Sequence, residues 1–473
     1  IPTTEPEKRV VPLDLFPSAL IDNIKILKTY SPDLPGEFSG GLVQMQTVEF
    51  PTTKVLNFSY STGFNSATSF RRSFDHRGGG YDFWGFDDGS RSLPGLIPTD
   101  ARIVQGRYTQ QQLQEFGRAF ATNWEPQEVT SMRPTQSFSL VGGNTFGRLG
   151  LVGALTFQNK PQNQFEIQRY LRHDGNRPFI FSNYEDFNVY NQAARLGAVL
   201  NAAVRLSPSN KLIFRNTLTH DSDKETRIFG GYDGGIDGTM RSERLRYIER
   251  GLMSTSVEGE HALAKVGNSL LRWQMTYSRS TRDEPDLREV IRGRLPDGRY
   301  SYLALSNSGQ RFFATLEDRI YEPLAEFAKP FYKGSFTGIL KIGYRGTFRG
   351  RDFEARRFRY IPQRVTTLNL FLPSDQLLSQ ANIRPDGFQI IEFTRATDTY
   401  VADMDVHAGF AMLDLALGGR WRVVGGVRVE DANINVTTLD PLAAAARPSI
   451  ASLINRDPMP AVNVIYALTP RQN

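Results

Sequence analysis

The chain of 473 residues contains no cysteine. This absence excludes a disulfide framework, a thiolate metal site and a cysteine nucleophile. The chain also lacks any uninterrupted apolar run near the roughly 18 residues that a membrane-spanning helix needs. With 40% hydrophobic residues and a mean hydropathy of -0.38, it cannot be a bundle of membrane helices. If it crosses a membrane, it does so with strands.

The chain also has little excess of charge of one sign, because 56 basic and 50 acidic residues leave a net charge of +6. The basic residues are spread along the chain and form no stripe, so the sequence predicts no nucleic-acid binding. The first residues carry no starting Met, no basic region and no apolar region of a signal peptide. We therefore expect both ends to be cuts in a longer protein, with any signal peptide removed or lying upstream.

The residues that are plentiful favour strands and tight turns, since 32 are Phe and 41 are Gly. Apolar and polar residues alternate in stretches of roughly ten or more, the pattern of membrane barrel strands. Near Leu200, for example, Leu196, Ala198 and Ala202 share one face, whereas Arg195 and Asn201 lie on the other. The pattern predicts about twelve strands, centred near Phe58, Leu140, Leu155, Val199, Phe214, Ser256, Met275, Glu326, Ile342, Gly409, Val427 and Val464.

The connections between these strands are unequal. Short turns such as Ser207 to Asn210 and Gly418-Gly419 close one end, and long segments, about Asn65 to Pro134 and about Gly350 to Asp398, close the other. Short turns on one side and long loops on the other are typical of outer-membrane barrels. A soluble β-sandwich or propeller is the alternative, because alternation alone does not say which face points inward. Strand length, loop asymmetry and aromatic residues near strand ends, namely Tyr277, Tyr344, Trp421 and Tyr466, favour the membrane barrel.

A family resemblance rests on the segment before the first barrel strand. Within the segment from Leu15 to Tyr30 a short helix leads into the strand Ile24 to Lys28, and Pro35-Gly36 and Gly40-Gly41 then precede a strand from Leu42 to Thr47. This order resembles the end of the plug domain of TonB-dependent receptors. Close backbone approach or positive φ would explain Gly36, Gly40 and Gly41 in a packed plug.

Two further segments resemble one subgroup of these receptors. Tyr81 to Pro94 is similar to its tryptophan-containing Gly-Phe-Asp-Asp-Gly segment, and Asp283 to Glu289 is similar to an early loop element. The resemblance covers nearly the whole chain, but the TonB box, the first half of the plug and the closing strand are missing. It implies the C-terminal part of a plug in residues 1–50 and the N-terminal part of a barrel in residues 51–473. That barrel would hold about 12 of about 22 strands, because plugged lumens occur in 22-stranded transporters.

No motif in the sequence gives good support for a catalytic or metal-binding site. Asp87 and Asp88 could be two calcium ligands, but an acidic turn explains them better, and the five histidines show no paired metal spacing. Gly78-Gly79-Gly80 lacks the Lys-Ser/Thr of a phosphate loop, so loop flexibility is the better account. Glu284 and Asp286 could serve a glycosidase, yet solvated loop charges are the simpler interpretation. We predict no catalytic residue, no metal, no cofactor and no enzyme.

The resemblance implies a multi-pass protein of the bacterial outer membrane that imports a scarce nutrient, such as a siderophore, vitamin, oligosaccharide or peptide. Its partners would be outer-membrane lipid, the nutrient, and the TonB energy-transducing complex, which would act through a segment absent from this chain. A surface adhesin that binds a partner without transport is the alternative, and a passive porin is disfavoured by the plug segment. Aromatic and Arg side chains recur at binding surfaces, so we name as candidate ligand contacts Arg71, Arg72, Tyr81, Trp84 and Arg91.

Overall fold

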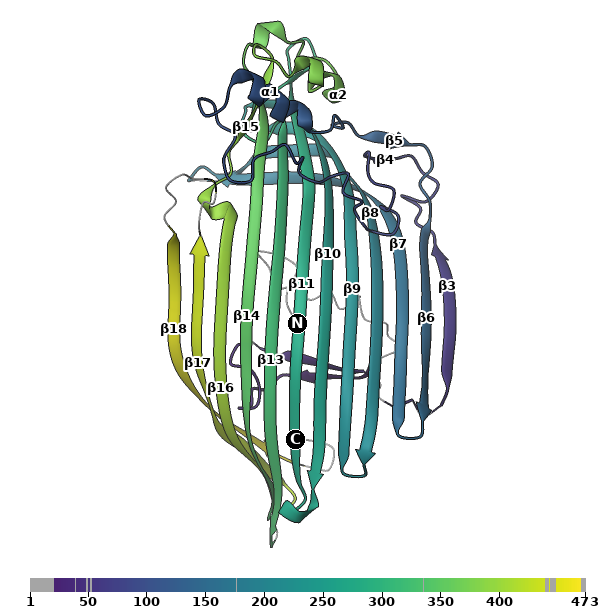
Figure 1. Ribbon diagram of the computed structural model, residues 1–473, viewed down its shortest axis with the longest axis vertical. Helices are drawn as coiled ribbons and strands as arrows, with labels where there is room; N and C mark the ends of the chain where they lie inside the picture. The colour runs from purple at the N-terminus through teal and green to yellow at the C-terminus, as the bar shows by residue number, and fades with distance from the viewer. Residues whose placement is uncertain are drawn as a thin grey trace.

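The computed structural model describes residues 21–38, 40–47, 50–51, 53–175, 177–334, 336–438, 442 and 448–468. One antiparallel sheet of fourteen strands dominates these residues. Its main path runs in the order β18-β17-β16-β14-β13-β11-β10-β9-β8-β7-β6-β3, and β12 and β15 pair with β11 and β14 off this path. Fourteen minus these two leaves twelve wall strands, which stand side by side in Figure 1.

Most wall strands are far longer than a globular strand, which rarely exceeds about ten residues. Their bounds are β3 Val55–Gly63, β6 Thr135–Phe146, β7 Leu149–His173, β8 Pro178–Ser207, β9 Asn210–Asp233, β10 Gly238–Leu263, β11 Ser269–Arg294, β13 Gln310–Lys333, β14 Phe336–Pro362, β16 Thr399–Leu417, β17 Trp421–Thr438 and β18 Ser449–Tyr466. Each of the twelve predicted strand centres lies in one of these strands, so this prediction is confirmed.

The remaining elements lie in the connections and in the segment before β3. They are β1 Ile21–Leu27, β2 Leu42–Thr47, β4 Ser73–Asp75, β5 Gln127–Val129, β12 Tyr300–Tyr302, β15 Phe388–Glu392, α1 Gln110–Ala119 and α2 Ser374–Leu377, with short 3-10 turns at Ala264–Val266, Val365–Thr367, Gln380–Asn382 and Ala396–Asp398. In Figure 1, α1, α2 and β15 gather at one end of the long strands. Within the described part of the chain, no helix is both long and apolar enough to cross a membrane.

The wall has two chemically different faces because side chains alternate along each strand. We call the polar face the one that carries Arg195, Asn201, Arg272, Lys341, Arg428 and Glu430. The opposite, apolar face carries Leu200, Leu218, Met275, Tyr344 and Val427, each between 38% and 52% exposed. Exposed large apolar side chains in such number indicate a surface that meets an apolar environment.

The apolar face is a belt with two borders. On β14 it runs from Phe336 to Phe348, longer than the roughly 9–11 residues that a tilted strand needs to cross a membrane. Tyr277 and Tyr321 pair at its upper border with ring centroids 4.8 Å apart, and Trp421 and Tyr466 pair at its turn-side border at 4.5 Å. Two residue pairs above the two tyrosines, on the same face, Arg279 and Arg319 are register partners. The aromatic residues therefore lie where the wall changes from apolar to charged, as interface girdles do.

The turns at the lower end have the predicted form. β8 ends at Ser207 and β9 begins at Asn210, while Gly418 and Gly419 have φ values of 57° and 75° between β16 and β17. Only glycine adopts this left-handed region without strain, which explains the pair at this turn.

The upper connections are more ordered than the sequence indicates. The predicted loop from Asn65 to Pro134 does connect β3 to β6, but it contains β4, β5 and α1. The predicted loop from Gly350 to Asp398 is wrong over its first part, because β14 continues to Pro362. Asp283 to Glu289 is likewise part of β11 and not of a loop. In these strand ends charged residues occupy both faces, so the hydrophobic alternation stops while the backbone pairing continues.

We predict that a charge in the belt destabilises the wall. Met275→Arg should lower the free energy of unfolding of the full-length protein in lipid vesicles by about 2–4 kcal/mol, since a basic residue on the lipid face loses its hydration. The control is Thr276→Arg, which places the same residue on the polar face opposite Glu322. Urea titration followed by gel mobility without heating measures both, and equal losses for the two variants would contradict a lipid-facing belt.

Candidate functional site

The hairpin before the barrel lies against the polar face of the wall. β1 and β2 pair in antiparallel fashion, and the loop between them reaches three wall strands. Lys341 Nζ on β14 lies 3.0 Å from Asp33 Oδ2, and the Gly36 N–H donates to Glu430 Oε1 on β17 over 3.0 Å. Asn463 Nδ2 on β18 donates to the Tyr30 carbonyl over 2.8 Å. The predicted helical stretch at residues 15–20 lies outside the described residues.

The three glycines of this hairpin have different surroundings. A Cβ on Gly36 would lie 2.5 Å from Glu430 Oε2 and 2.8 Å from Met459, so this residue allows the loop to approach the wall. Gly40 has a φ of +94°, where a side chain would be strained. A Cβ on Gly41 would lie at an ordinary 3.5 Å from the Leu27 carbonyl. Close approach and positive φ thus occur, each at one position.

Charge fixes the loop on the wall. Burial alone would raise the pKa of Asp33, but hydrogen bonding to Ser31 and the charge of Lys341 outweigh it and hold this pKa below its usual range. Arg428 lies 2.6 Å from Glu430 and has a nearly buried side chain. Leu34 of the same loop is also buried, at 5% exposed, so the hairpin is attached by a small number of polar contacts together with the burial of this side chain.

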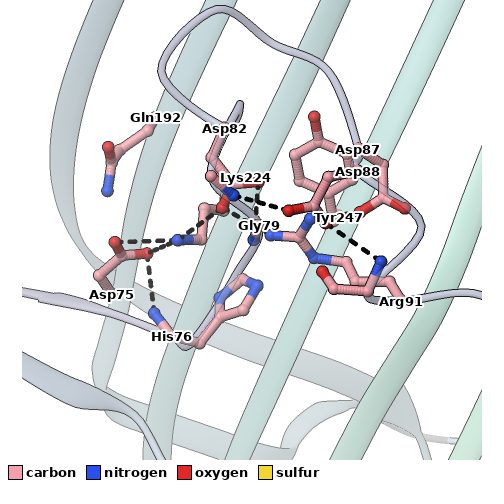
Figure 2. Close-up of polar contacts among 12 residues, drawn as sticks. Asp75, His76, Gly79, Asp82, Asp87, Asp88, Arg91, Gln192, Lys224 and Tyr247 are labelled. Atoms are coloured by element: carbon pink, nitrogen blue, oxygen red, sulfur yellow. Dashed lines mark hydrogen bonds and ion pairs between the residues drawn. The ribbon is translucent and has the colours of Figure 1, made fainter.

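The first long loop lies on the other face of the wall. A cluster of charged residues binds it there, and we call it the loop cluster: Asp75, Asp82, Asp87, Arg91 and Lys224 (Figure 2). Arg91 lies 2.6 Å from both Asp82 and Asp87, and Lys224 on β9 lies 2.9 Å from Asp75 and 3.0 Å from Asp82. The Arg91 guanidinium also lies 4.1 Å above the Tyr247 ring on β10. The loop is therefore attached to β9 by ion pairs of Lys224 and to β10 by a cation–π contact of Arg91 with Tyr247.

The charges hold each other in the ionised state. Burial alone would lower the pKa of Arg91, but Asp82 and Asp87 outweigh it and raise this pKa above its usual value. The exposed Asp88 accepts hydrogen bonds from Ser90 and from the Gly80 backbone, which lower its pKa to about 2. Among the described residues no group of acidic and histidine side chains has the arrangement of a metal site. Asp87 and Asp88 make the contacts of an acidic turn.

Gly78 and Gly79 have a steric role that the sequence did not reveal. A Cβ on Gly78 would collide with Asp82 and Arg91, and one on Gly79 would collide with Asp88. Close packing against these side chains is therefore a further reason for glycine at positions 78 and 79, whereas a Cβ on Gly80 would meet only Asp88 Oδ2, at 3.9 Å.

His76 lies beneath the loop cluster and is 2% exposed. Its Nδ1 lies 3.0 Å from Thr226 Oγ1, and its Nε2 has no hydrogen-bond partner among the described residues. Burial and the charges of Arg288, Lys224 and Arg91 hold its pKa well below the usual 6.5. The ring is therefore neutral at physiological pH.

The candidate ligand contacts are placed differently from one another. Arg71, Arg72, Tyr81 and Trp84 are exposed, and Arg72 forms an exposed ion pair of 2.5 Å with Glu128. Arg91 is 3% exposed and holds the loop cluster together, so a ligand could reach it only after the loop opened. Ligand contact by the other four stays a prediction.

A second buried cluster ties the first long loop to β11 and β13. Arg311 Nη2 donates to the Ala121 carbonyl over 2.5 Å and to Asn123 Oδ1 over 3.0 Å, and Arg288 contacts the Asn123 carbonyl. Asp286 lies 3.6 Å from both arginines. Glu284 and Asp286 are each 5% exposed, so their interpretation as solvated loop charges is wrong. Asp286 has a φ of 56° at an irregularity in the pairing of β11 with β13. The sequence does not predict this irregularity.

Above the belt, two grooves lie between β11, β13, β14 and the first long loop or β16. Their volumes are about 440 Å³ and 280 Å³. Carboxylates line both grooves, and these residues were not among the predicted ligand contacts. They are Asp283, Glu317, Asp352 and Glu354 of the wall strands in the larger groove, and Asp283 and Glu354 together with Asp87 of the first long loop in the smaller one. Only the burial and register of the strands bring them together, so no local sequence signal could have found them.

No family model matches the chain, and no curated protein matches it. Among solved structures, the siderophore receptor PiuA from Acinetobacter baumannii has a TM-score of 0.47 at 10% identity, covering 91% of this chain and 49% of that one. The open form of the ferric-catecholate import receptor Fiu from E. coli has a TM-score of 0.47 at 11% identity, covering 94% and 57%. Its closed form has a TM-score of 0.41 at 12% identity, covering 74% and 53%.

These neighbours are a siderophore receptor and a ferric-catecholate import receptor. The chain spans about half the length of each of these receptors.

We predict that Arg91 is needed to hold the first long loop. Arg91→Met leaves Asp87 without its cationic partner and Asp82 with Lys224 alone, and removal of one member of a buried ion pair costs about 3 kcal/mol. Hydrogen-deuterium exchange should report easier opening of residues 77–93 by that amount. Arg72→Met is the matched control, because its exposed ion pair contributes less than about 1 kcal/mol. Unchanged exchange in the Arg91 variant would contradict the role of the loop cluster.

We also predict that acid loosens this loop. The pKa of His76 is depressed in the folded loop, so the neutral ring favours the folded loop over the open one. This contribution to the stability of the loop is complete above about pH 6.5 and is lost as the pH falls below that value. Protection factors of residues 77–93 should therefore be lower at pH 5 than at pH 7. His76→Asn cannot take up the proton and should show a smaller pH dependence; an equal dependence would assign it to other groups.

Proposed function

We propose that this chain is part of an outer-membrane receptor of the TonB-dependent type, comprising the end of the plug in residues 1–50 and part of the barrel wall in residues 51–473. The full receptor binds a scarce nutrient at its upper loops and imports it when energy from the TonB complex moves the plug. The ligand belongs to the range of siderophores, vitamins, oligosaccharides and peptides. The site carries out no catalysis.

One observation carries this proposal. The hairpin of β1 and β2 lies on the polar face of the wall, opposite to the apolar belt, and is attached through Asp33, Gly36 and Tyr30. A segment on the polar face of a lipid-facing wall is in the position of an internal plug. A porin needs an open lumen, so this segment speaks against a passive pore.

The attachment also has the strength that a movable plug requires. An ion pair such as that of Asp33 with Lys341 and single hydrogen bonds contribute about 1 kcal/mol each. A modest pull can therefore separate the loop from the wall, whereas the wall strands are held by continuous backbone pairing. The adhesin alternative needs no such difference, because a partner that binds to the upper loops requires no movement of the plug.

Radiolabelled ferric catecholate is a suitable first probe, since ferric-catecholate import is the activity named for one structural neighbour. Cells that express the full-length protein should bind the probe and accumulate it inside, and deletion of TonB should abolish accumulation while surface binding remains. Oligosaccharides and peptides follow as further probes with the same two measurements.

Accumulation that persists without TonB would contradict active import. Surface binding of every probe without accumulation in TonB-positive cells would favour the adhesin.

A variant with Lys341→Met should show faster hydrogen-deuterium exchange in residues 30–38 while the wall strands keep their protection, because only the attachment of the loop is weakened.

A further inference from the structure

The segment Tyr81 to Phe86 does not lie on the polar face where a lumenal ligand would pass. The Trp84 ring packs on Phe157 of β7 with centroids 4.9 Å apart, and the Phe86 ring stacks on His220 of β9 at 4.1 Å and 9°. Phe157 and His220 have the same parity as Leu155 and Leu218, two residues of the apolar belt. The segment therefore covers the apolar face of the wall.

Its height on the wall coincides with the upper end of the belt. Phe157, Leu196 and His220 are register partners across β7, β8 and β9. One outward side chain below them, Leu155 and Leu218 are 38% and 47% exposed. One outward side chain above them, Asn159 and Ser222 are polar. The segment thus lies at the transition from apolar to polar on these three strands.

The backbone of the segment is fixed to the wall. Asn159 Nδ2 donates to the Phe83 carbonyl over 2.7 Å, and His220 Nε2 lies 2.6 Å from the Gly85 carbonyl. Gly85, with a φ of +90°, has room for no side chain, because a Cβ would lie 2.9 Å from Ser222 Oγ and 3.0 Å from the Ala194 Cβ. The aromatic side chains are therefore presented in fixed positions.

Three of these side chains point outward and stay exposed: Tyr81 at 62%, Trp84 at 49% and Phe86 at 40%. Indole and phenol rings combine an apolar body with a polar group and concentrate at the border between membrane and water. Elsewhere on the wall, Tyr277 of β11 and Tyr321 of β13 occupy that border. On β8 and β9 the outward positions at the top of the belt hold Leu196 and His220, so the wall itself supplies no Tyr or Trp there.

We propose that Tyr81, Trp84 and Phe86 form a membrane anchor that completes the aromatic girdle over β7 to β9, with the boundary between lipid headgroups and acyl chains as its partner. The inference rests on the proposed function in one respect, namely that the belt faces lipid. The three rings cover the outward positions directly above the exposed residues of the belt, with no gap in register. This continuity with the belt favours lipid over a soluble ligand as the partner. The loop cluster just above them then fixes the first long loop to the membrane surface as well as to the wall.

Tryptophan fluorescence tests this in the full-length protein reconstituted in phosphatidylcholine vesicles, with and without lipid brominated at the upper acyl carbons. The contribution of Trp84 is the difference between the protein and its Trp84→Phe variant. Brominated lipid should reduce this contribution by at least about half, as expected for an indole at the interface. Iodide in the aqueous phase should have little effect on it.

Two other tryptophans serve as internal references. Trp124 is 2% exposed in a core above the belt, so the Trp124→Phe difference should be insensitive to brominated lipid. Trp421 is 48% exposed at the turn-side border of the belt, and its contribution should be quenched. All three variants should keep the gel mobility of the folded protein.

The outcomes separate the two proposals. Quenching of Trp421 and Trp84 by brominated lipid supports the anchor. Quenching of Trp421 alone, with Trp84 accessible to iodide, overturns the anchor and leaves the outer-membrane receptor in place, with Trp84 then free to contact a ligand or a protein partner. No quenching of Trp421 means that the belt does not face lipid, and both proposals fail.

Discussion

Backbone pairing along the wall strands is the constraint on which the rest of this structure depends. In hydrocarbon no water can satisfy a peptide N–H or C=O, so each must bond to a neighbouring strand. β10, for example, pairs with β9 over its whole length up to His261. Continuous pairing fixes the direction of every side chain, and it thereby separates the polar face, which the hairpin contacts, from the apolar face. The hairpin and the first long loop then bind to opposite faces, the loop through aromatic as well as polar contacts.

The belt could be predicted from the sequence because its physical cause is local. A lipid-facing residue must be apolar and its neighbour need not be, so residues such as Met275 and Thr276 reveal the strand by themselves. Above the belt water contacts both faces, and Arg351, Asp352 and Glu354 follow one another on β14 with no hydrophobic period. The strand persists there through pairing with β13 and β16. That pairing involves residues far away in sequence, so the end of β14 at Pro362 could not be derived.

In the candidate site, too, features with a local cause could be predicted from the sequence, and features that depend on distant residues could not. The order of Gly36, Gly40 and Gly41 between two strands suggested a plug end, and the structure places the hairpin against the wall. The burial of Arg91 could not be predicted from the sequence, because it requires Tyr247, a residue more than 150 positions away. For the same reason the sequence makes Trp84 a candidate ligand contact only by its residue type, as an aromatic side chain, whereas its place at the top of the belt follows from the register of β7 with β8 and β9.

The irregularities in strand pairing have a consequence for how such a wall can change over evolutionary time. Among the described wall strands, the register shifts lie above the belt, as at Glu284 to Leu287 and Asn183 to Asp186, with one more beside the turn at Ser207. An inserted or deleted residue within the belt would turn every following side chain to the wrong face. A bulge above it absorbs the same change. The upper strand ends can therefore gain or lose residues and acquire new surfaces, while the lipid-facing part keeps its length.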